Sequence, residues 1–172
     1  MSEGSADSAA TDTLTPIART PRVGVRAAVV RKGRILMNHY EGDVFDLPGG
    51  GQEHGEAQAD ALVRECREEI GARVEPFGLA CAFEVITDVA ARSGARLENL
   101  FHQVNLVFWC DLAEGEEPGL GDVPDGRQIG VQWLPIDELD RYDVRPRELA
   151  AWLQSDPSIR PTWLGTIVGP GR

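Results

Sequence analysis

Residues 50–72, with the sequence GGQEHGEAQADALVRECREEIGA, decide the fold of this chain. A glycine turn leads into a segment whose apolar residues recur every three or four positions, which predicts an amphipathic helix beginning near Glu56 or Ala57. Gly71 suits the left-handed conformation that often follows a helix end, so the helix should stop there. We expect the rest of the chain to be arranged around this turn and helix.

The expected helix has two different faces. An apolar stripe should pack on the core and consists of Ala59, Leu62, Val63, Cys66 and Ile70. Glu65, Glu68 and Glu69 converge on another face, which should point away from the core and where they repel one another at neutral pH. Their hard oxygen ligands suit Mg²⁺ or Mn²⁺. The alternative is a solvated acidic face, which is the commoner explanation for a helix rich in glutamate.

Alternating and β-branched segments on both sides of the helix predict a sheet. Strands are expected at residues 23–30, 35–40, 44–47, 79–86, 100–112, 131–134 and 163–168, with short helices at 135–139 and 146–153. The first two strands should form a hairpin, and the last should lie at a sheet edge. Polar segments at 87–99 and 113–126 have the length of lids, binding loops or disordered segments.

The composition is typical of one globular domain. A chain of 172 residues is long enough for one core, and we assign the domain to residues 22–168, with a disordered tail at 1–21 and a short tail at 169–172. No apolar run approaches the ~20 residues of a membrane helix, and the N-terminus lacks the features of a secretory signal. We therefore expect a cytoplasmic protein whose cysteines, Cys66, Cys81 and Cys110, are buried reduced thiols.

The net charge of −11 limits the choice of partners. A nucleic-acid polymer is disfavoured, because such a ligand calls for a basic surface that replaces its counterions. A small polyanionic substrate is compatible with an acidic protein if divalent cations invert the local field. The acidic cluster therefore predicts a metal ion and a small substrate.

The spacing of the central stretch is specific. It runs Gly, five residues, Glu, seven residues, Arg-Glu, hydrophobe, any residue, Glu-Glu, any residue, Gly, hydrophobe, and so resembles the box that defines the Nudix (MutT-like) hydrolases. All seven fixed positions are filled, by Gly50, Glu56, Arg64, Glu65, Glu68, Glu69 and Gly71. A chance match is on the order of one in 10⁹ per start position. The two hydrophobic positions hold the small residues Cys66 and Ala72, and the flanking sequences at 46–50 and 133–139 also resemble the family.

The resemblance implies an α/β protein with the Nudix fold, an α/β/α sandwich with a mixed β-sheet. It also implies Mg²⁺- or Mn²⁺-dependent cleavage of a diphosphate that links a nucleoside to another moiety, as in nucleotide sugars or ADP-ribose. The alternatives are a nucleoside triphosphate pyrophosphohydrolase of the MutT type and a non-catalytic ligand-binding module of the same fold. Family members are often dimers, so a homodimer is one expected assembly.

The same resemblance implies roles for the box residues. Glu65 and Glu69 would be the main metal ligands and Glu68 would share or bridge a metal, while Glu65 is also a candidate general base. Arg64 would orient a carboxylate, and Glu56 would pair with positive charge or accept amide hydrogen bonds at the helix start. The carbonyl of Gly49 or Gly50 could supply another metal ligand.

A further carboxylate is common in this family before the strand at 131–134. Asp125 or Gln128 could occupy that position here, although Pro124-Asp125-Gly126 is equally an ordinary turn.

Substrate contacts are harder to predict. Arg26, Arg92 and Arg96 could bind phosphate, because guanidinium groups bind it with two hydrogen bonds, but for each one singly an exposed surface arginine is the commoner explanation. Trp109 and Trp133 could stack on a base or serve the core. We expect the loops at 87–99 and 113–130 to select the substrate.

Overall fold

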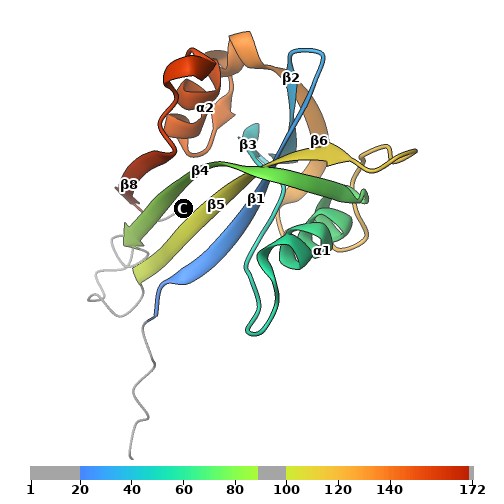
Figure 1. The fold of residues 1–172 in the computed structure, drawn as a ribbon, viewed down its shortest axis with the longest axis horizontal. Coiled ribbons are helices and arrows are strands. Elements are labelled where there is room, and N and C mark those ends of the chain that lie inside the picture. The colour runs from blue at the N-terminus through green and yellow to red at the C-terminus, as the bar shows by residue number, and fades with distance from the viewer. Residues whose placement is uncertain (1–19, 89–99, 171–172) are drawn as a thin grey trace, which may run out of the picture.

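The computed structural model describes residues 20–88 and 100–170. In chain order its elements are β1 (Arg22–Arg31), β2 (Arg34–Tyr40), β3 (Val44–Asp46), α1 (Gln58–Ile70), β4 (Val74–Asp88), β5 (Leu100–Leu112), β6 (Gln128–Pro135), η2 (Ile136–Arg141), β7 (Asp143–Val144), α2 (Arg147–Gln154), η3 (Pro157–Ile159) and β8 (Trp163–Pro170). Figure 1 shows the strands as a strongly twisted layer with α1 on one side and α2 on the other.

The sheet is mixed and runs β7-β3-β2-β1-β5-β4-β8, with β6 paired to β2 outside this path. Strand β1 is parallel to β5, and β4 is parallel to β8, whereas β4 and β5 are antiparallel. The hairpin of β1 and β2 shares only two residue pairs, Val30 with Ile35 and Arg31 with Arg34. The two halves of the sheet are therefore joined at one corner.

Two apolar clusters cover the opposite faces of the sheet. One packs α1 on Val25, Ala27 and Val29 of β1 and on Leu36 of β2. The other packs α2 on the intervening residues of the same strands, including Ala28, Ile35 and Met37. Because neighbouring strand residues face opposite ways, each strand contributes to both clusters. The expected α/β sandwich with a mixed sheet is confirmed.

Most expected elements are present, and some boundaries differ. Strand β5 has the predicted bounds, and α2 buries Leu149, Trp152 and Leu153 as expected. Strand β4 begins five residues before the predicted position, at Val74 rather than residue 79. Its alternation is interrupted by irregularities in its register with β5, between Pro76 and Gly78 and again just after Leu79. Such bulges shift the side-chain pattern, so the first part of the strand was missed.

Helix α1 ends as predicted, with Gly71 in the left-handed conformation at φ 60°. The predicted faces need two corrections. Ala59 is exposed and Ala61 is buried in its place. Glu69 does not point away from the core, because only 5% of its surface is exposed. It follows Leu62 by seven residues, which is close to two helical turns, and so lies in line with the apolar stripe.

The segment at residues 113–127 is packed against the end of α1, where we expected a lid, a binding loop or disorder. Three of its backbone N–H groups donate hydrogen bonds to the last carbonyls of α1: Gly119 to Ile70 at 3.0 Å, Gly121 to Glu69 at 3.0 Å and Val123 to Glu68 at 3.1 Å. These carbonyls have no partner within the helix itself. The segment therefore caps the helix that carries the glutamates.

The remaining expectations fall into three groups. The cysteines Cys66, Cys81 and Cys110 are all free and buried, as predicted. No helix within residues 20–88 and 100–170 is long and apolar enough to cross a membrane. The expected tail at 1–21 and the loop at 87–99 lie mostly outside the described residues.

Candidate active site

The glycine turn is held by the backbone of β1. The N–H groups of Val25 and Ala27 donate to the carbonyls of Gly50 at 2.9 Å and Pro48 at 2.8 Å, and Gln52 N–H donates to the Val23 carbonyl at 3.0 Å. A Cβ at Gly49 would lie 2.9 Å from the Cα of Arg26, and Gly49 also has a φ of 133°. Only glycine fits this approach, so the turn lies directly against strand β1.

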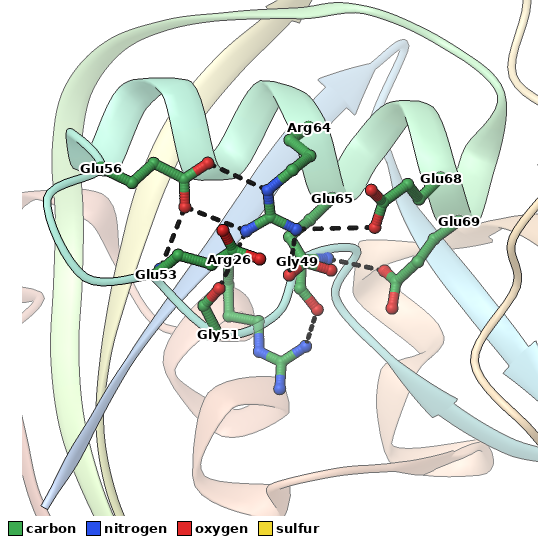
Figure 2. A network of polar contacts seen from close by, with 9 residues as sticks. All are labelled: Arg26, Gly49, Gly51, Glu53, Glu56, Arg64, Glu65, Glu68 and Glu69. Carbon is green, nitrogen blue, oxygen red and sulfur yellow. Dashed lines mark hydrogen bonds and ion pairs between the residues drawn. The ribbon is translucent and has the colours of Figure 1, made fainter.

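Two helix carboxylates meet this turn. Glu69 Oε2 accepts a hydrogen bond from the N–H of Gly49 at 2.8 Å, and Figure 2 shows this side chain reaching across from α1. Glu65 lies over Gly50, where an added Cβ would be only 2.6 Å from the Oε1 atom of Glu65. Two negative groups of α1 therefore lie against the glycine turn, although each is 15 residues or more from the turn in the sequence.

Arg64 connects α1 with the segment that precedes it and with the glycine turn (Figure 2). Its guanidinium donates to both carboxylate oxygens of Glu56, at 2.9 and 3.0 Å, to Glu65 Oε1 at 2.8 Å and to the Gly51 carbonyl at 3.0 Å. Glu68 approaches the same group at 3.5 Å. These hydrogen bonds lower the pKa of Glu56 and raise that of Arg64. The predicted pairing of Glu56 with positive charge is present in the structure, and Arg64 lies where it can orient Glu65.

Glu69 is held from the other side by Asn38. The Asn38 amide donates to Glu69 Oε2 at 2.8 Å, and its Oδ1 accepts from Gln128 Nε2 at 3.1 Å. The pKa of Glu69 is raised to about 7, because burial and the charge of Glu65 together outweigh the hydrogen bonds from Gly49 and Asn38 and the charge of Arg26, which lower it. The carboxyl group of Glu69 therefore titrates near neutral pH in the metal-free protein.

The two candidates for an additional acid lie close together but differ in their surroundings. Gln128 is buried, and its Nε2 also donates to the backbone carbonyl of Glu69 at 2.9 Å. Gln128 therefore binds both the end of α1 and the side chain of Asn38. Asp125 is exposed, and its carboxylate accepts from Gly126 N–H at 2.8 Å, as in an Asp-Gly turn. Asp125 also lines the large cleft described next.

Arg26 connects the glycine turn with a cleft of about 670 Å³. Its Nη1 donates to the carbonyl of Gly49, and the Arg26 side chain is partly buried. The interpretation of Arg26 as an exposed surface arginine is therefore wrong. Burial lowers the pKa of Arg26, but the charges of Asp46 and Glu69 outweigh this effect and raise it overall. The floor and walls of the cleft include the sheet residues Phe83, Val85, Thr87, Phe101, Gln103, Asn105 and Ile167.

The two tryptophans that could have stacked on a base do not line the cleft. Trp109 packs on the α2 cluster and stacks on Trp152 with ring centroids 5.6 Å apart, while Trp133 packs on the α1 cluster. Both tryptophans therefore serve the core. Arg92 and Arg96 lie outside the described residues.

Sequence reasoning missed several polar residues of the site. Asn38 is fully buried and lies on the same face of β2 as Leu36. A polar residue at this inward-facing position of the strand could have indicated its role. Gln103 and Asn105 are similarly buried on β5, in phase with Val107. A buried polar residue in an alternating strand usually has a partner that the local sequence does not show.

The donor set suits a hard divalent cation in chemical type. Carboxylates of Glu65, Glu68 and Glu69 and the carbonyl of Gly49 offer oxygen atoms near one turn. They are not yet gathered around one point, because no three His, Cys, Asp or Glu side chains in the described part of the chain are close enough to share an ion. Glu65 and Glu68 instead contact Arg64, at 2.8 and 3.5 Å.

A sheet between two helical layers, with a glycine turn facing glutamates of the first helix, defines the class of Nudix folds. The chain belongs to the NUDIX family: the family model described as NUDIX domain matches residues 20–153. The resemblance inferred from the box is thereby confirmed.

Individual relatives agree with this assignment. A crystal structure of a MutT NUDIX hydrolase from Burkholderia pseudomallei is 29% identical, covers 79% of this chain and 99% of its own, and has a TM-score of 0.61. YjhB of Bacillus subtilis (strain 168), which is named provisionally as an ADP-ribose pyrophosphatase, is 29% identical over 98 residues, or 56% of this chain and 44% of its own length. The chain thus spans less than half of that relative. A crystal structure of an ADP-ribose pyrophosphatase from Streptococcus suis shares the fold at 22% identity, with 86% of this chain and 99% of that chain covered and a TM-score of 0.54.

Proposed function

We propose that this protein is a hydrolase of phosphorus-containing anhydrides, which cleaves the diphosphate of a nucleoside diphosphate joined to another moiety with the help of Mg²⁺ or Mn²⁺. The observation that carries the proposal is the meeting of Glu65 and Glu69 at the Gly49–Gly50 turn, beside a cleft that begins at Arg26. A solvated acidic helix face would not bury Glu69 or place it on a backbone N–H group.

The donors for the cation would be Glu65, Glu69 and the Gly49 carbonyl, with Glu68 sharing or bridging. The Gly50 carbonyl, which was also expected as a ligand, accepts the Val25 N–H within the sheet, whereas the Gly49 carbonyl is contacted by a side chain that can move. When bound, Mg²⁺ or Mn²⁺ would neutralise the charge of the diphosphate and acidify the attacking water.

The side chains of this protein would supply the remaining steps. Arg26 lies between the cleft and the turn, where it can bind a phosphate oxygen and leave the Gly49 carbonyl. A carboxylate of the Glu65 and Glu69 pair takes the proton from the water as its oxygen attacks phosphorus and the bridging P–O bond breaks. Arg64 orients Glu65 during this step, and the hydrogen bonds from Gly49 and Asn38 orient Glu69.

The substrate assignment rests on two relatives. YjhB, which is named as an ADP-ribose pyrophosphatase, favours a nucleoside diphosphate derivative. The MutT hydrolase of Burkholderia pseudomallei, which is matched along nearly its whole length, favours the alternative of a nucleoside triphosphate. We place the former first, and we propose a cytoplasmic enzyme with a small-molecule substrate and a homodimer as its assembly.

The test is a panel of ADP-ribose, nucleotide sugars, dinucleotides and nucleoside triphosphates with Mg²⁺ or Mn²⁺, with products identified by mass. We expect Glu69→Gln to lower kcat/KM by about 10²-fold or more while the protein stays folded. Glu53→Gln is the matched control, because this glutamate of the same box is exposed and contacts Glu56 through its backbone N–H and carbonyl, which the substitution retains. Full activity of Glu69→Gln at saturating Mg²⁺, or no cleavage of any compound, would contradict the proposal.

A further inference from the structure

Gln103 and Asn105 lie on β5 and line the cleft beside Phe101. Only 5% of Gln103 and 3% of Asn105 is exposed. Residues two apart on a strand share a face, so the two amides and the aromatic ring stand in one row on the floor of the cleft. None of the three belongs to the glutamate helix or to the glycine turn.

The two amides bind each other and leave one amide nitrogen and one amide oxygen without a partner. Gln103 Nε2 donates to Asn105 Oδ1 at 2.6 Å. Asn105 Nδ2 and Gln103 Oε1 make no hydrogen bond with any described residue. If both amides were turned over, Gln103 would offer the donor and Asn105 the acceptor. In either orientation, the pair presents one amide nitrogen as donor and one amide oxygen as acceptor.

These unused atoms reach the cleft. Every fully buried side-chain nitrogen or oxygen in the described part of the chain has a hydrogen-bond partner, so the unused donor and acceptor are not sealed in the core. On the far side the pair rests on β1, where an added Cβ at Gly24 would lie 2.7 Å from Asn105 Oδ1. Polar atoms at the bottom of an apolar cleft are costly unless water or a ligand binds them.

We propose that Gln103 and Asn105 form a base-recognition pair, in which the amides bind an adjacent donor and acceptor on the edge of a nucleobase. Phe83 and Phe101 supply flat apolar surface beside the pair, which suits the face of a heterocycle. Phe83 is the register partner of Asn105 on the neighbouring strand β4. A purely structural amide pair would not leave a matched donor and acceptor open to a cleft.

The pair is also placed correctly relative to the glutamates. Gly24 is the register partner of Asn105, and Arg26 follows two residues later on the same face of β1, about 7 Å away. Arg26 in turn donates to the Gly49 carbonyl. A base on the amides would therefore place its sugar over β1 and its phosphates at Arg26. This last step rests on the proposed function, whereas base recognition by the amides does not.

The experiment measures equilibrium binding of AMP, GMP, UMP and ribose 5-phosphate by calorimetry without divalent cations. We expect at least one nucleotide to bind about tenfold or more tightly than ribose 5-phosphate, which has no base. Asn105→Asp keeps the acceptor for Gln103 but replaces the unused donor with an acceptor. It should lower the ratio of nucleotide to ribose 5-phosphate affinity about tenfold for a donor-acceptor edge, and it should favour guanine, whose edge offers two donors.

Three controls make the result decisive. The ribose 5-phosphate measurement removes the general effect of the added negative charge, and Gln132→Glu adds the same charge on an exposed residue of β6 outside the cleft. Gln103→Leu removes the acceptor without adding charge and should lower the same ratio. Unchanged ratios in both cleft variants, or equal affinity of the wild type for all four compounds, would overturn the inference. Amide-dependent base binding without hydrolysis in the substrate panel would refute the proposed function alone.

Discussion

Replacing Glu69 by glutamine should stabilise the metal-free protein at alkaline pH. The carboxylate accepts hydrogen bonds from Gly49 N–H and from Asn38, both at 2.8 Å on Oε2. A glutamine Oε1 can accept both bonds, so the substitution removes the charge and retains the contacts. The charge is the unfavourable component, because 95% of the side chain is removed from water.

The size of the effect follows from the pKa of Glu69, which burial raises from 4.5 to about 7. Below pH 4.5 the folded and unfolded states both carry the proton, and the charge makes no difference. Between pH 4.5 and 7 the unfolded chain loses the proton first, so the folded wild type loses relative stability as the pH rises. Above pH 7 the full penalty applies, at most about 3 kcal/mol, and we expect about 1–3 kcal/mol.

The assay is urea denaturation followed by tryptophan fluorescence, with a chelator present, at pH 5 and pH 8. Glu69→Gln should unfold at higher urea than the wild type at pH 8, and the difference should shrink at pH 5. Glu53→Gln should match the wild type at both values. If Glu69→Gln were less stable than the wild type at pH 8, or if the difference were the same at both values, the burial argument would be wrong.

Three further predictions concern the same region. Gly121→Ala should lower the free energy of unfolding by about 1–3 kcal/mol, because its Cβ would lie 2.7 Å from the carbonyl carbon of Glu68. Gly126 has open space around it, so Gly126→Ala should change the free energy of unfolding by less than about 0.5 kcal/mol in the same denaturation assay. Arg64→Lys should lower kcat/KM or the apparent Mg²⁺ affinity by about 10- to 100-fold, since the single nitrogen of an ammonium group cannot replace the three guanidinium nitrogens that hold Glu56, Glu65 and the Gly51 carbonyl; unchanged Mg²⁺ titrations of activity would contradict this. Mg²⁺ should raise the melting temperature of the wild type in a concentration-dependent way, and a flat response in calorimetry would count against the metal site.

The fold could be read from the sequence where one pattern dominated. The box defined α1 and its end at Gly71, and the alternation of β5 gave both of its bounds. The beginning of β4 could not be read, because Pro76 and Gly78 disturb the alternation and only the pairing with β5 holds the chain extended. Strand pairing is a contact between distant segments, which a local pattern does not contain.

The candidate site, like the fold, could be predicted only in part from the sequence. Spacing alone brought Glu65 and Glu69 together with the glycine turn, but it did not show that Glu69 is buried or that Asn38 holds it. Arg26 could not be told from a surface arginine, because its partner, the Gly49 carbonyl, lies 23 residues away in the sequence. The roles of such side chains depend on which strands lie side by side.

The backbone and the side chains of strand β1 contact different parts of the site. Its N–H groups at Val25 and Ala27 fix the glycine turn, while the side chain of Arg26 lines the cleft. Backbone hydrogen bonds do not depend on residue identity, so the turn keeps these two bonds when a side chain of β1 is substituted, and only its contact with the Arg26 side chain varies with the sequence of this strand. Descendants of such a protein could acquire new substrates one side chain at a time and still retain the same reaction.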